Sequence, residues 1–324
     1  MMYRLLTISC YFGQLPEYFP LFLRSLEKNP TVDFLLVTDC EVSCAPDNVR
    51  VHHCTFQQMK DRIQDLVEFP IVLDRPYKLC DYKPLWMQAF AEYLPGYDFC
   101  GYCDMDLIFG DIRAFLTDEI LSKYDKIYEM GHLTYYRNTE EVLRRYRLDG
   151  GVDYRYAFTT PDIVAFDELA GIQNIYDYHG LSTYKARDPA DITYRRVRFT
   201  RTDFHVPVEE LPTNNYRHQV FYWEDGKVFR AYLQDDLVCK DEFIYIHMSK
   251  RKLPCNSIDG SCRSFFITSR GFWAKTAEIT DADILRFEPY RPLSEFCRFV
   301  QCKWSDTKEN AKYYWEILKR KLIP

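Results

Sequence analysis

Hydrophobic positions in the first third of the chain alternate between strand and helix patterns. Apolar runs at residues 3–10, 32–38 and 49–53 predict buried strands. Helical spacing fills the segment from about Pro16 to Glu27 and begins again after Thr55, a suitable N-cap. This order is typical of an open nucleotide-binding sheet, in which ligands lie at the carboxyl ends of the strands. No GxGxxG is present, so a dinucleotide site is not expected.

The pattern continues through the middle of the chain. Residues 76–94 predict a helical region, and residues 112–124 predict a second helix. Residues 126–130 resemble a strand, and the following GHLTYYRN predicts a loop that feeds a helix at Thr139. Residues 170–220 show little periodicity and predict no clear element.

The last third combines strands with a helical end. Residues 221–234 predict a hairpin with Asp225-Gly226 at its turn, and residues 243–247 predict the last strand. From about Ser269 the pattern turns helical. We therefore expect one large domain over 1–268, with a nucleotide-binding half to about 112 and a second half after it, followed by a helical extension over 269–324.

The segment YDFCGYCDMDLIFGDI (97–112) is the most informative stretch. Two apolar runs flank Asp104-Met105-Asp106, and strand alternation would point both carboxylates to one face. Two buried carboxylates are costly unless a cation neutralises them. Mg²⁺ and Mn²⁺ prefer such oxygen ligands and also bind phosphate. The segment therefore predicts a sugar-nucleotide site, with acids of a surface loop as the alternative.

A second Asp-x-Asp, Asp281-Ala282-Asp283, serves as an internal comparison. It follows Thr280 and precedes ILRF, which is the pattern of a helix N-terminus where acidic residues favour the dipole. We expect this pair to be structural. Spacing alone therefore does not identify a metal site.

Basic and acidic residues upstream of the first pair add candidate partners. Lys78, Asp81 and Lys83 precede it, and Pro84 suggests a helix start at which cations could reach a diphosphate. A solvated basic face explains the same residues equally well.

Later residues supply a candidate third ligand and a candidate base. His247 ends the strand FIYIH and precedes MSKRK, so it could offer a nitrogen to the metal beside phosphate-facing Lys250 and Arg251. A histidine there is also compatible with a core position. Asp167-Glu168 follows IVAF and suits either a general base at a strand end or a helix N-terminus.

Composition narrows the class of protein. The 324 residues are 47 % hydrophobic and 17 % aromatic and carry a net charge of −6, which excludes wholesale disorder and argues against nucleic acid as the main partner. Twelve cysteines include only one CxxC, so reduced thiols of a cytoplasmic protein are expected rather than a zinc site. There is no signal-like start and no apolar run near 18 residues, so we expect neither secretion nor a membrane span.

The C-terminal tail mixes basic and aromatic residues. Residues 308–324 predict an amphipathic helix that either contacts the inner face of the plasma membrane peripherally or packs on the domain. The two interpretations stay open.

These pieces together resemble a family of bacterial glycosyltransferases encoded with capsule, exopolysaccharide and lipopolysaccharide genes, formerly catalogued as a domain of unknown function. The resemblance covers roughly residues 5–252, through YFGQLPEYFPLFLRS, VDFLLVTD, YKLCDYKP, GHLTYYRN, AFDE and FIYIHMSKRK as well as residues 97–112. The order is also similar to glycogenin-like and lipopolysaccharide galactosyltransferase families. The segment after the final histidine departs from those families, which carry a glycine and a Lys-Pro-Trp-like run there.

The resemblance implies an α/β fold of GT-A (Rossmann-like) type, a mixed central sheet flanked by helices, and a metal-dependent hexosyltransferase. It implies a UDP-sugar donor, Mn²⁺ or Mg²⁺, and a glycan or lipid-linked acceptor. Asp104, Asp106 and His247 would hold the metal, and Asp167 and Glu168 would face the acceptor. The donor would contact Ser9, Tyr11, Asp39, Lys78, Asp81, Lys83, Asp104, Asn138, Lys250 and Arg251.

Two rival functions remain at this stage. DMDLIFGD imitates the nucleophile motif of haloacid-dehalogenase-like phosphatases, with Asp235-Asp236 as the distal acids, although Ile108 stands where that motif has Thr or Val. The second rival is a sugar- or nucleotide-binding module that has no catalytic activity.

Overall fold

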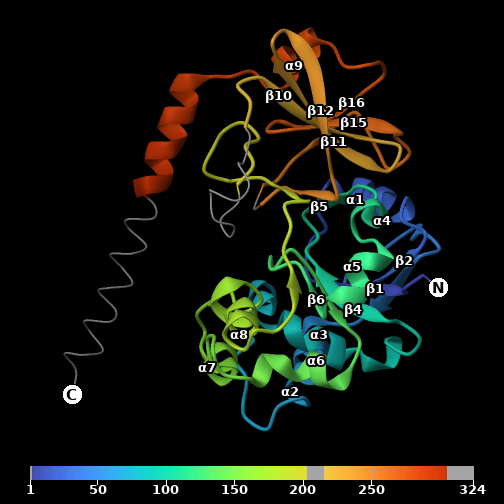
Figure 1. Cartoon of the computed structure of the whole chain (residues 1–324), viewed down its shortest axis with the longest axis vertical. Coiled ribbons are helices and arrows are strands. Elements are labelled where there is room, and N and C mark those ends of the chain that lie inside the picture. The colour runs from blue at the N-terminus through green and yellow to red at the C-terminus, as the bar shows by residue number, and fades with distance from the viewer. Residues whose placement is uncertain (1, 203–214, 250, 305–324) are drawn as a thin grey trace.

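The computed structural model describes residues 2–202, 215–249 and 251–304. Its centre is a seven-stranded sheet, shown in the lower part of Figure 1. The strand order is β3 (Val49–His53), β2 (Val32–Thr38), β1 (Leu5–Tyr11), β4 (Phe99–Cys103), β7 (Leu133–Arg137), β6 (Lys126–Ile127) and β8 (Thr183–Tyr184). The first four strands of this order, β3, β2, β1 and β4, run parallel to one another, and β7 is antiparallel to β4. The predicted α/β class with a mixed sheet is therefore confirmed.

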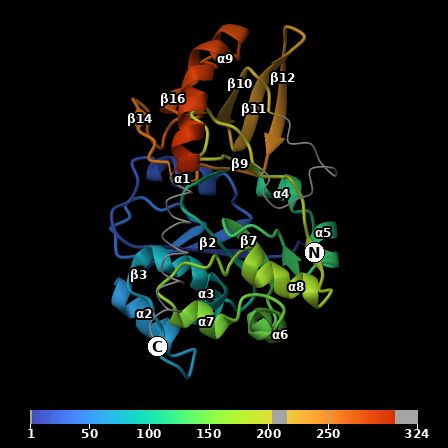
Figure 2. The same cartoon turned by 90° about the vertical axis from the view of Figure 1, so that its left-hand side faces the viewer.

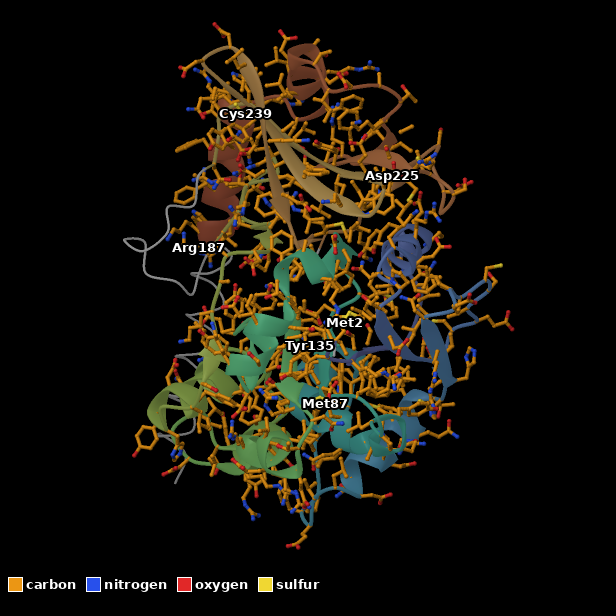
Figure 3. The ribbon with its side chains drawn as sticks, turned by 45° about the vertical axis from the view of Figure 1, so that its right-hand side comes forward. Met2, Met87, Tyr135, Arg187, Asp225 and Cys239 are labelled. Atoms are coloured by element: carbon orange, nitrogen blue, oxygen red, sulfur yellow. The ribbon has the colours of Figure 1, made fainter. Side chains whose placement is uncertain are left out.

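Alternation along the central strands divides the core into two layers. In β1, Leu5 packs with α1 (Phe19–Glu27) on one face, whereas Leu6 and Ile8 pack with α2 (Phe56–Gln64) and α3 (Lys83–Ala89) on the other. Figure 3 shows a member of each layer, Tyr135 of β7 and Met87 of α3, within this lower part of the molecule. Helices cover both faces because both faces of a buried parallel sheet are apolar.

A second, six-stranded sheet lies above the first (Figures 1 and 2). Its order is β12 (Leu237–Phe243), β11 (Lys227–Gln234), β10 (Gln219–Glu224), β15 (Ser264–Thr268), β16 (Gly271–Ala274) and β14 (Cys255–Asn256). Helix α9 (Asp281–Phe287) packs on its outer face through Ile284 and Phe287.

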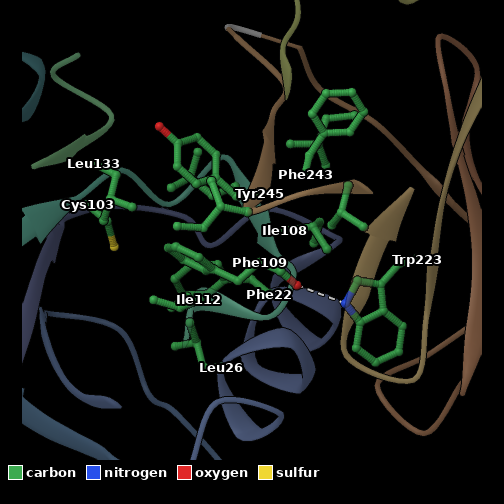
Figure 4. Close-up of a cluster of buried hydrophobic side chains, with 14 of the residues drawn as sticks. Phe22, Leu26, Cys103, Ile108, Phe109, Ile112, Leu133, Trp223, Phe243 and Tyr245 are labelled. Atoms are coloured by element: carbon green, nitrogen blue, oxygen red, sulfur yellow. Dashed lines mark hydrogen bonds between the residues drawn. The ribbon is translucent and has the colours of Figure 1, made fainter. Parts of the chain in front are cut away.

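A three-stranded sheet joins the two larger ones. It consists of β5 (Leu107–Phe109), β13 (Tyr245–His247) and β9 (Ala190–Asp191). The indole Nε1 of Trp223, from β10, donates to the carbonyl of Phe109 at 2.9 Å within a cluster of buried apolar side chains (Figure 4). Because β5 directly follows β4 along the chain, this joint fixes the segment between the two strands.

Short helices complete the described fold. They are the 3₁₀ helices at Pro76–Tyr82, Ala91–Tyr93 and Arg145–Arg147, a π-helix at Leu169–Gln173, and the α-helices α4 (Ile112–Phe115), α5 (Asp118–Lys123), α6 (Glu140–Arg144), α7 (Tyr154–Thr159) and α8 (Asn174–Tyr178). Residues 292–304 are also helical. Among the described residues, no helix combines the length and apolar character needed to cross a membrane.

Several predicted elements match, and three need correction. The strands at 32–38 and 49–53 and the hairpin around Asp225-Gly226 are confirmed, as is the N-cap at Thr55, which forms a capping box with Gln58. The predicted helix at 112–124 is two helices, because Thr117 begins a new one by accepting from the Ile120 N–H. The predicted loop at 131–138 contains β7, which fills a central place in the sheet.

The third correction concerns the end of the chain. The hairpin of β15 and β16 crosses the expected boundary at 268, so 243–247 is not the last strand and helical structure starts at Asp281. Thr280 caps that helix in a capping box with Asp283, which confirms a structural role for the second Asp-x-Asp.

Candidate active site

Asp104-Met105-Asp106 forms the crossing between the seven-stranded and three-stranded sheets. It is a bend between β4 and β5, so the alternation of one continuous strand does not explain it, contrary to the prediction. Neighbouring backbone holds it in place: the Asp104 N–H donates to the His132 carbonyl at 3.0 Å, and the Met248 N–H donates to the Asp106 carbonyl at 2.9 Å.

The two carboxylates nevertheless converge with His247. Asp104, Asp106 and His247 each offer one ligand atom, and these atoms all lie within 4.8 Å of one another. His247 Nε2 lies 3.5 Å from an Asp106 carboxylate oxygen. The two carboxylates are partly exposed, at 32 % and 27 % of the side-chain surface. Two carboxylates and one imidazole suit Mn²⁺ or Mg²⁺, and the exposure leaves room for a substrate.

Asp191 fixes the orientation of His247. The parallel pairing of β9 with β13 places these residues opposite each other, and His247 Nδ1 lies 2.7 Å from an Asp191 carboxylate oxygen. A carboxylate on Nδ1 keeps the proton there and leaves Nε2 for a metal, which is the usual arrangement of a histidine ligand. Burial lowers the pKa of His247, but Asp106 and Asp191 outweigh it and raise that pKa well above its usual value.

His132 supports the same ring from its other side. Its imidazole stacks on that of His247 with centroids 4.3 Å apart, and its Nδ1 lies 2.6 Å from the Tyr245 hydroxyl. His132, Asp191 and His247 form a second group with metal-binding atoms, but His132 and Asp191 are buried. The group containing Asp104 and Asp106 is the better candidate, because a metal there is accessible to a substrate.

Lys83 joins the metal group to the acidic pair. It begins α3, and its buried ammonium lies 2.7 Å from Asp104 and 2.8 Å from Asp167, and donates to the Gly131 carbonyl at 2.7 Å. Burial alone would lower the pKa of Lys83, but the two carboxylates raise it well above its usual value. Lys83 is thus a fixed positive charge at the edge of the site.

Asp167 and Glu168 lie at the start of a helix rather than at a strand end. They directly precede the π-helix Leu169–Gln173, and π-helical turns are frequent at functional sites. A Cβ on Gly131 would lie 2.3 Å from an Asp167 oxygen and 2.8 Å from Glu168 Cγ, so the glycine permits their approach. Burial, helped by Asp167, raises the pKa of Glu168 to about 7.

The ends of β1 and β2 contribute further expected residues. Tyr11 ends β1, and its pKa is raised by burial, with Cys40 and Asp106 adding to the effect. Asp39 follows β2 and accepts a hydrogen bond from the Gly13 N–H at 3.0 Å, which orders the loop after β1. Ser9 is buried, and its side chain lies beside that of Cys103.

Lys78 and Asp81 do not lie free at the site, contrary to prediction. Both are fully buried, 2.6 Å apart. Lys78 also donates to the Ala157 carbonyl, and Asp81 accepts from the Val164 and Phe166 N–H groups. The pair holds the segment that leads to Asp167 and is therefore structural.

Asn138 and Arg251 also have structural contacts. Because β7 is antiparallel to β4, Asn138 lies at the opposite end of β4 from Asp104, where its amide donates to the Leu94 and Tyr97 carbonyls. Arg251 donates to the Val197, Thr193 and Arg196 carbonyls, which leaves it fixed on that loop. Lys250 lies outside the described residues.

Sequence reasoning missed three residues at the site. Asp191 lies in the unparsed region 170–220, although its apolar neighbours Ala190 and Ile192 hint at a short strand. His132 precedes β7, which had been taken for a loop. Tyr77 is 60 % exposed, and its pKa is raised by burial and by Cys80, with smaller contributions from Asp104 and Asp106.

Comparisons with solved structures find distant glycosyltransferases. One is the glycosyltransferase GlyE of Streptococcus pneumoniae TIGR4, with 9 % identity and a TM-score of 0.33 over 58 % of this chain and 46 % of that one. Another is the galactosyltransferase LgtC in complex with donor and acceptor sugar analogues, with 10 % identity and a TM-score of 0.33 over 58 % of this chain and 75 % of that one. At these scores neither similarity supports the assignment of an activity. The alignment with GlyE covers less than half of the GlyE chain.

No curated protein matches the chain in sequence. A family profile does match, and it covers residues 7–276, which include every described residue of the candidate site. The chain therefore belongs to the family of unknown function DUF6625.

Proposed function

We propose that this protein is a metal-dependent, GT-A-type glycosyltransferase of bacterial capsule or lipopolysaccharide biosynthesis. It moves a sugar from a nucleotide-diphosphate donor, a UDP-sugar, to a hydroxyl of a growing polysaccharide or lipid-linked glycan. The observation that carries this proposal is the convergence of Asp104, Asp106 and His247 beside the buried cation Lys83.

The metal ligands would be Asp104, Asp106 and the Nε2 atom of His247. Mn²⁺ or Mg²⁺ bound there supplies positive charge that stabilises the leaving nucleoside diphosphate. Asp191 acts through His247, since it holds the ring in the orientation that offers Nε2.

Glu168 is the better general base of the two adjacent acids. Asp167 already forms an ion pair with Lys83 at 2.8 Å, so its carboxylate is committed. The pKa of Glu168, raised to about 7, suits a group that accepts a proton from an acceptor hydroxyl near neutral pH. Asp167 then positions Lys83, which also donates to the Gly131 carbonyl.

Aromatic side chains are candidates for the nucleotide contacts. Tyr11, at the end of β1, and exposed Tyr77 both lie within the electrostatic reach of Asp106. A tyrosine ring at either position could stack on a base or a sugar. We further propose that the half of the domain to about residue 112 binds the donor and that the later half binds the acceptor. The proposed location is cytoplasmic, with a peripheral membrane contact through residues 308–324, which lie outside the described residues.

The phosphatase alternative loses support. Asp235 and Asp236 form the turn between β11 and β12, both with positive φ. The other end of this hairpin, at Phe243, lies next to Gly110, which follows β5. The turn with Asp235 and Asp236 is therefore at the end of the hairpin away from the candidate site. Asp235 and Asp236 therefore cannot be the acids that such a phosphatase needs beside its nucleophile.

Donor hydrolysis tests the proposal. Purified protein is incubated with UDP-, GDP- and CMP-sugars and Mn²⁺, and released nucleotide is measured. We expect release from a UDP-sugar that EDTA abolishes and that Asp106→Asn lowers at least about a thousandfold, whereas Asp281→Asn in the second Asp-x-Asp retains it. Release from no donor, or release that survives EDTA, would overturn the proposal, and phosphate release from simple esters would favour the phosphatase.

A further inference from the structure

The helix at residues 292–304 exposes its large apolar side chains to solvent. A surface helix of a globular protein normally turns its apolar face inward. Here Leu293, Phe296, Val300 and Trp304 are 81 %, 65 %, 38 % and 65 % exposed. At 100° per residue these four positions fall within an arc of about 80°. Figure 1 shows this helix at the outer edge of the molecule.

The inward face of the same helix carries polar anchors. Glu295 is only 6 % exposed, and its carboxylate accepts from the Val197 and Arg198 N–H groups at 3.2 and 2.9 Å. Arg298 donates to the Tyr194 carbonyl at 3.1 Å. These contacts fix the rotation of the helix, so the apolar face stays outward.

Charge indicates what covers that face. Residues 291–304 contain three basic residues, Arg291, Arg298 and Lys303, and one acidic residue, Glu295, whereas the whole chain has a net charge of −6. A basic segment at the end of an acidic protein favours an anionic partner. Leucine, phenylalanine and tryptophan on one face with basic residues around them are the composition of a helix that lies in a lipid interface.

A second copy of the chain fits the face less well. A coiled-coil seam that begins at Leu293 and Phe296 continues at Val300 and then requires an apolar residue at 303, where this chain has lysine. Trp304 instead widens the apolar face beyond a two-position seam.

We propose that the outward face of residues 292–304 docks on an anionic lipid bilayer. This surface is distinct from the predicted tail contact at 308–324 and does not depend on glycosyl transfer. The loop anchored by Glu295 runs back from Asp191, which contacts His247. The docked helix is thus tied to the loop that leads away from the candidate site.

Vesicle flotation of the full chain tests this. The probes are vesicles of phosphatidylcholine alone and of phosphatidylcholine with phosphatidylglycerol. Wild-type protein should float with the anionic vesicles, and Leu293→Ser with Phe296→Ser should lower the partition coefficient at least about tenfold, because two large apolar side chains no longer enter lipid. Leu293→Trp should retain binding.

The control is Leu237→Ser with Val238→Ser, which removes two exposed apolar residues from the start of β12. It should float like wild type. Equal floating of the Leu293 and Phe296 variant and wild type would overturn the proposal, as would a wild-type dimer that the same variant dissociates in the absence of vesicles. Metal-dependent donor hydrolysis in solution should be unchanged in this variant, so failure of docking and failure of the proposed activity are separate results.

Discussion

His247 lies with Nδ1 2.7 Å from a carboxylate oxygen of Asp191, and its other nitrogen faces Asp106 at 3.5 Å. The contact depends on the pairing of two short strands, β9 and β13, that come from distant parts of the chain. We predict that Asp191→Asn weakens Mn²⁺ binding about 10- to 100-fold, because a neutral amide accepts the Nδ1 proton more weakly than a carboxylate and its NH2 group can donate to Nδ1 instead. Calorimetric titration of the metal-free protein measures this.

The control for Asp191 is an exposed pair of the same kind. His179 Nε2 lies 2.9 Å from Asp149 on the surface, away from the candidate site. Asp149→Asn should leave Mn²⁺ affinity unchanged. If Asp191→Asn also left the affinity unchanged while the protein stayed folded, His247 would not be a ligand oriented by Asp191.

Glu168 predicts a pH dependence of stability in the metal-free protein. Its pKa is about 7 in the folded state against an ordinary value of 4.5. The folded state therefore holds this proton more tightly, and the stability associated with it is complete below about pH 4.5 and lost as the pH rises through 7. We predict that Glu168→Gln, which imitates the protonated acid, loses less thermal stability than wild type between pH 4.5 and pH 8.

Thermal unfolding in EDTA at the two pH values checks this prediction. The comparison is between the pH differences of the two proteins, so any constant effect of the substitution cancels. Glu119→Gln is the control, since Glu119 is exposed and Lys123 lowers its pKa. A wild-type protein and a Glu168→Gln variant with equal pH dependence would refute the raised pKa.

Local pattern was enough to predict most of the central sheet. The strands at 32–38 and 49–53 match because continuous apolar runs between turn residues have few alternatives, and Thr55 caps as its sequence suggests. The three residues of the candidate metal site were also predicted, because Asp104, Asp106 and His247 each follow or end an apolar run. Their actual convergence was not available from strand alternation, since Asp104 and Asp106 lie in a bend between two sheets.

Long-range pairing also explains why several expected site residues have structural contacts instead. Lys78 and Asp81 look like surface charges in sequence, but each neutralises the other inside the core. Asn138 was placed at the site by the family resemblance, and the antiparallel pairing of β7 with β4 sends it to the other end of β4. Asp191 was missed because a two-residue strand has no periodicity to detect. Long-range pairing thus determined what local pattern could not.

Lys78 and Asp81 predict a stability effect rather than a substrate effect. Both side chains are 0 % exposed and lie 2.6 Å apart. Lys78→Met should lower the free energy of unfolding by about 3–5 kcal/mol, because it leaves a buried carboxylate without its cation. Chemical denaturation measures this, and Lys123→Met, in the exposed pair with Glu119, should leave stability unchanged. A stable Lys78→Met protein with a raised KM for the donor would instead support the diphosphate role predicted from sequence.

A substitution at Gly131 tests whether the ion pair between Lys83 and Asp167 matters for activity. A Cβ there would lie 2.3 Å from the Asp167 oxygen that binds Lys83, so Gly131→Ala must displace Asp167. We predict a loss of about 1–3 kcal/mol in stability from overpacking, with at least about a tenfold fall in metal-dependent donor hydrolysis. Mn²⁺ affinity should change little, because Asp106 and His247 are not among the nearest neighbours of that Cβ. Gly260→Ala is the matched control, since the nearest atom to its Cβ would be the Pro20 carbonyl oxygen of α1, 3.1 Å away. Full activity in Gly131→Ala would show that the Lys83–Asp167 pair serves the fold alone, whereas lost metal affinity would place Gly131 within the metal site itself.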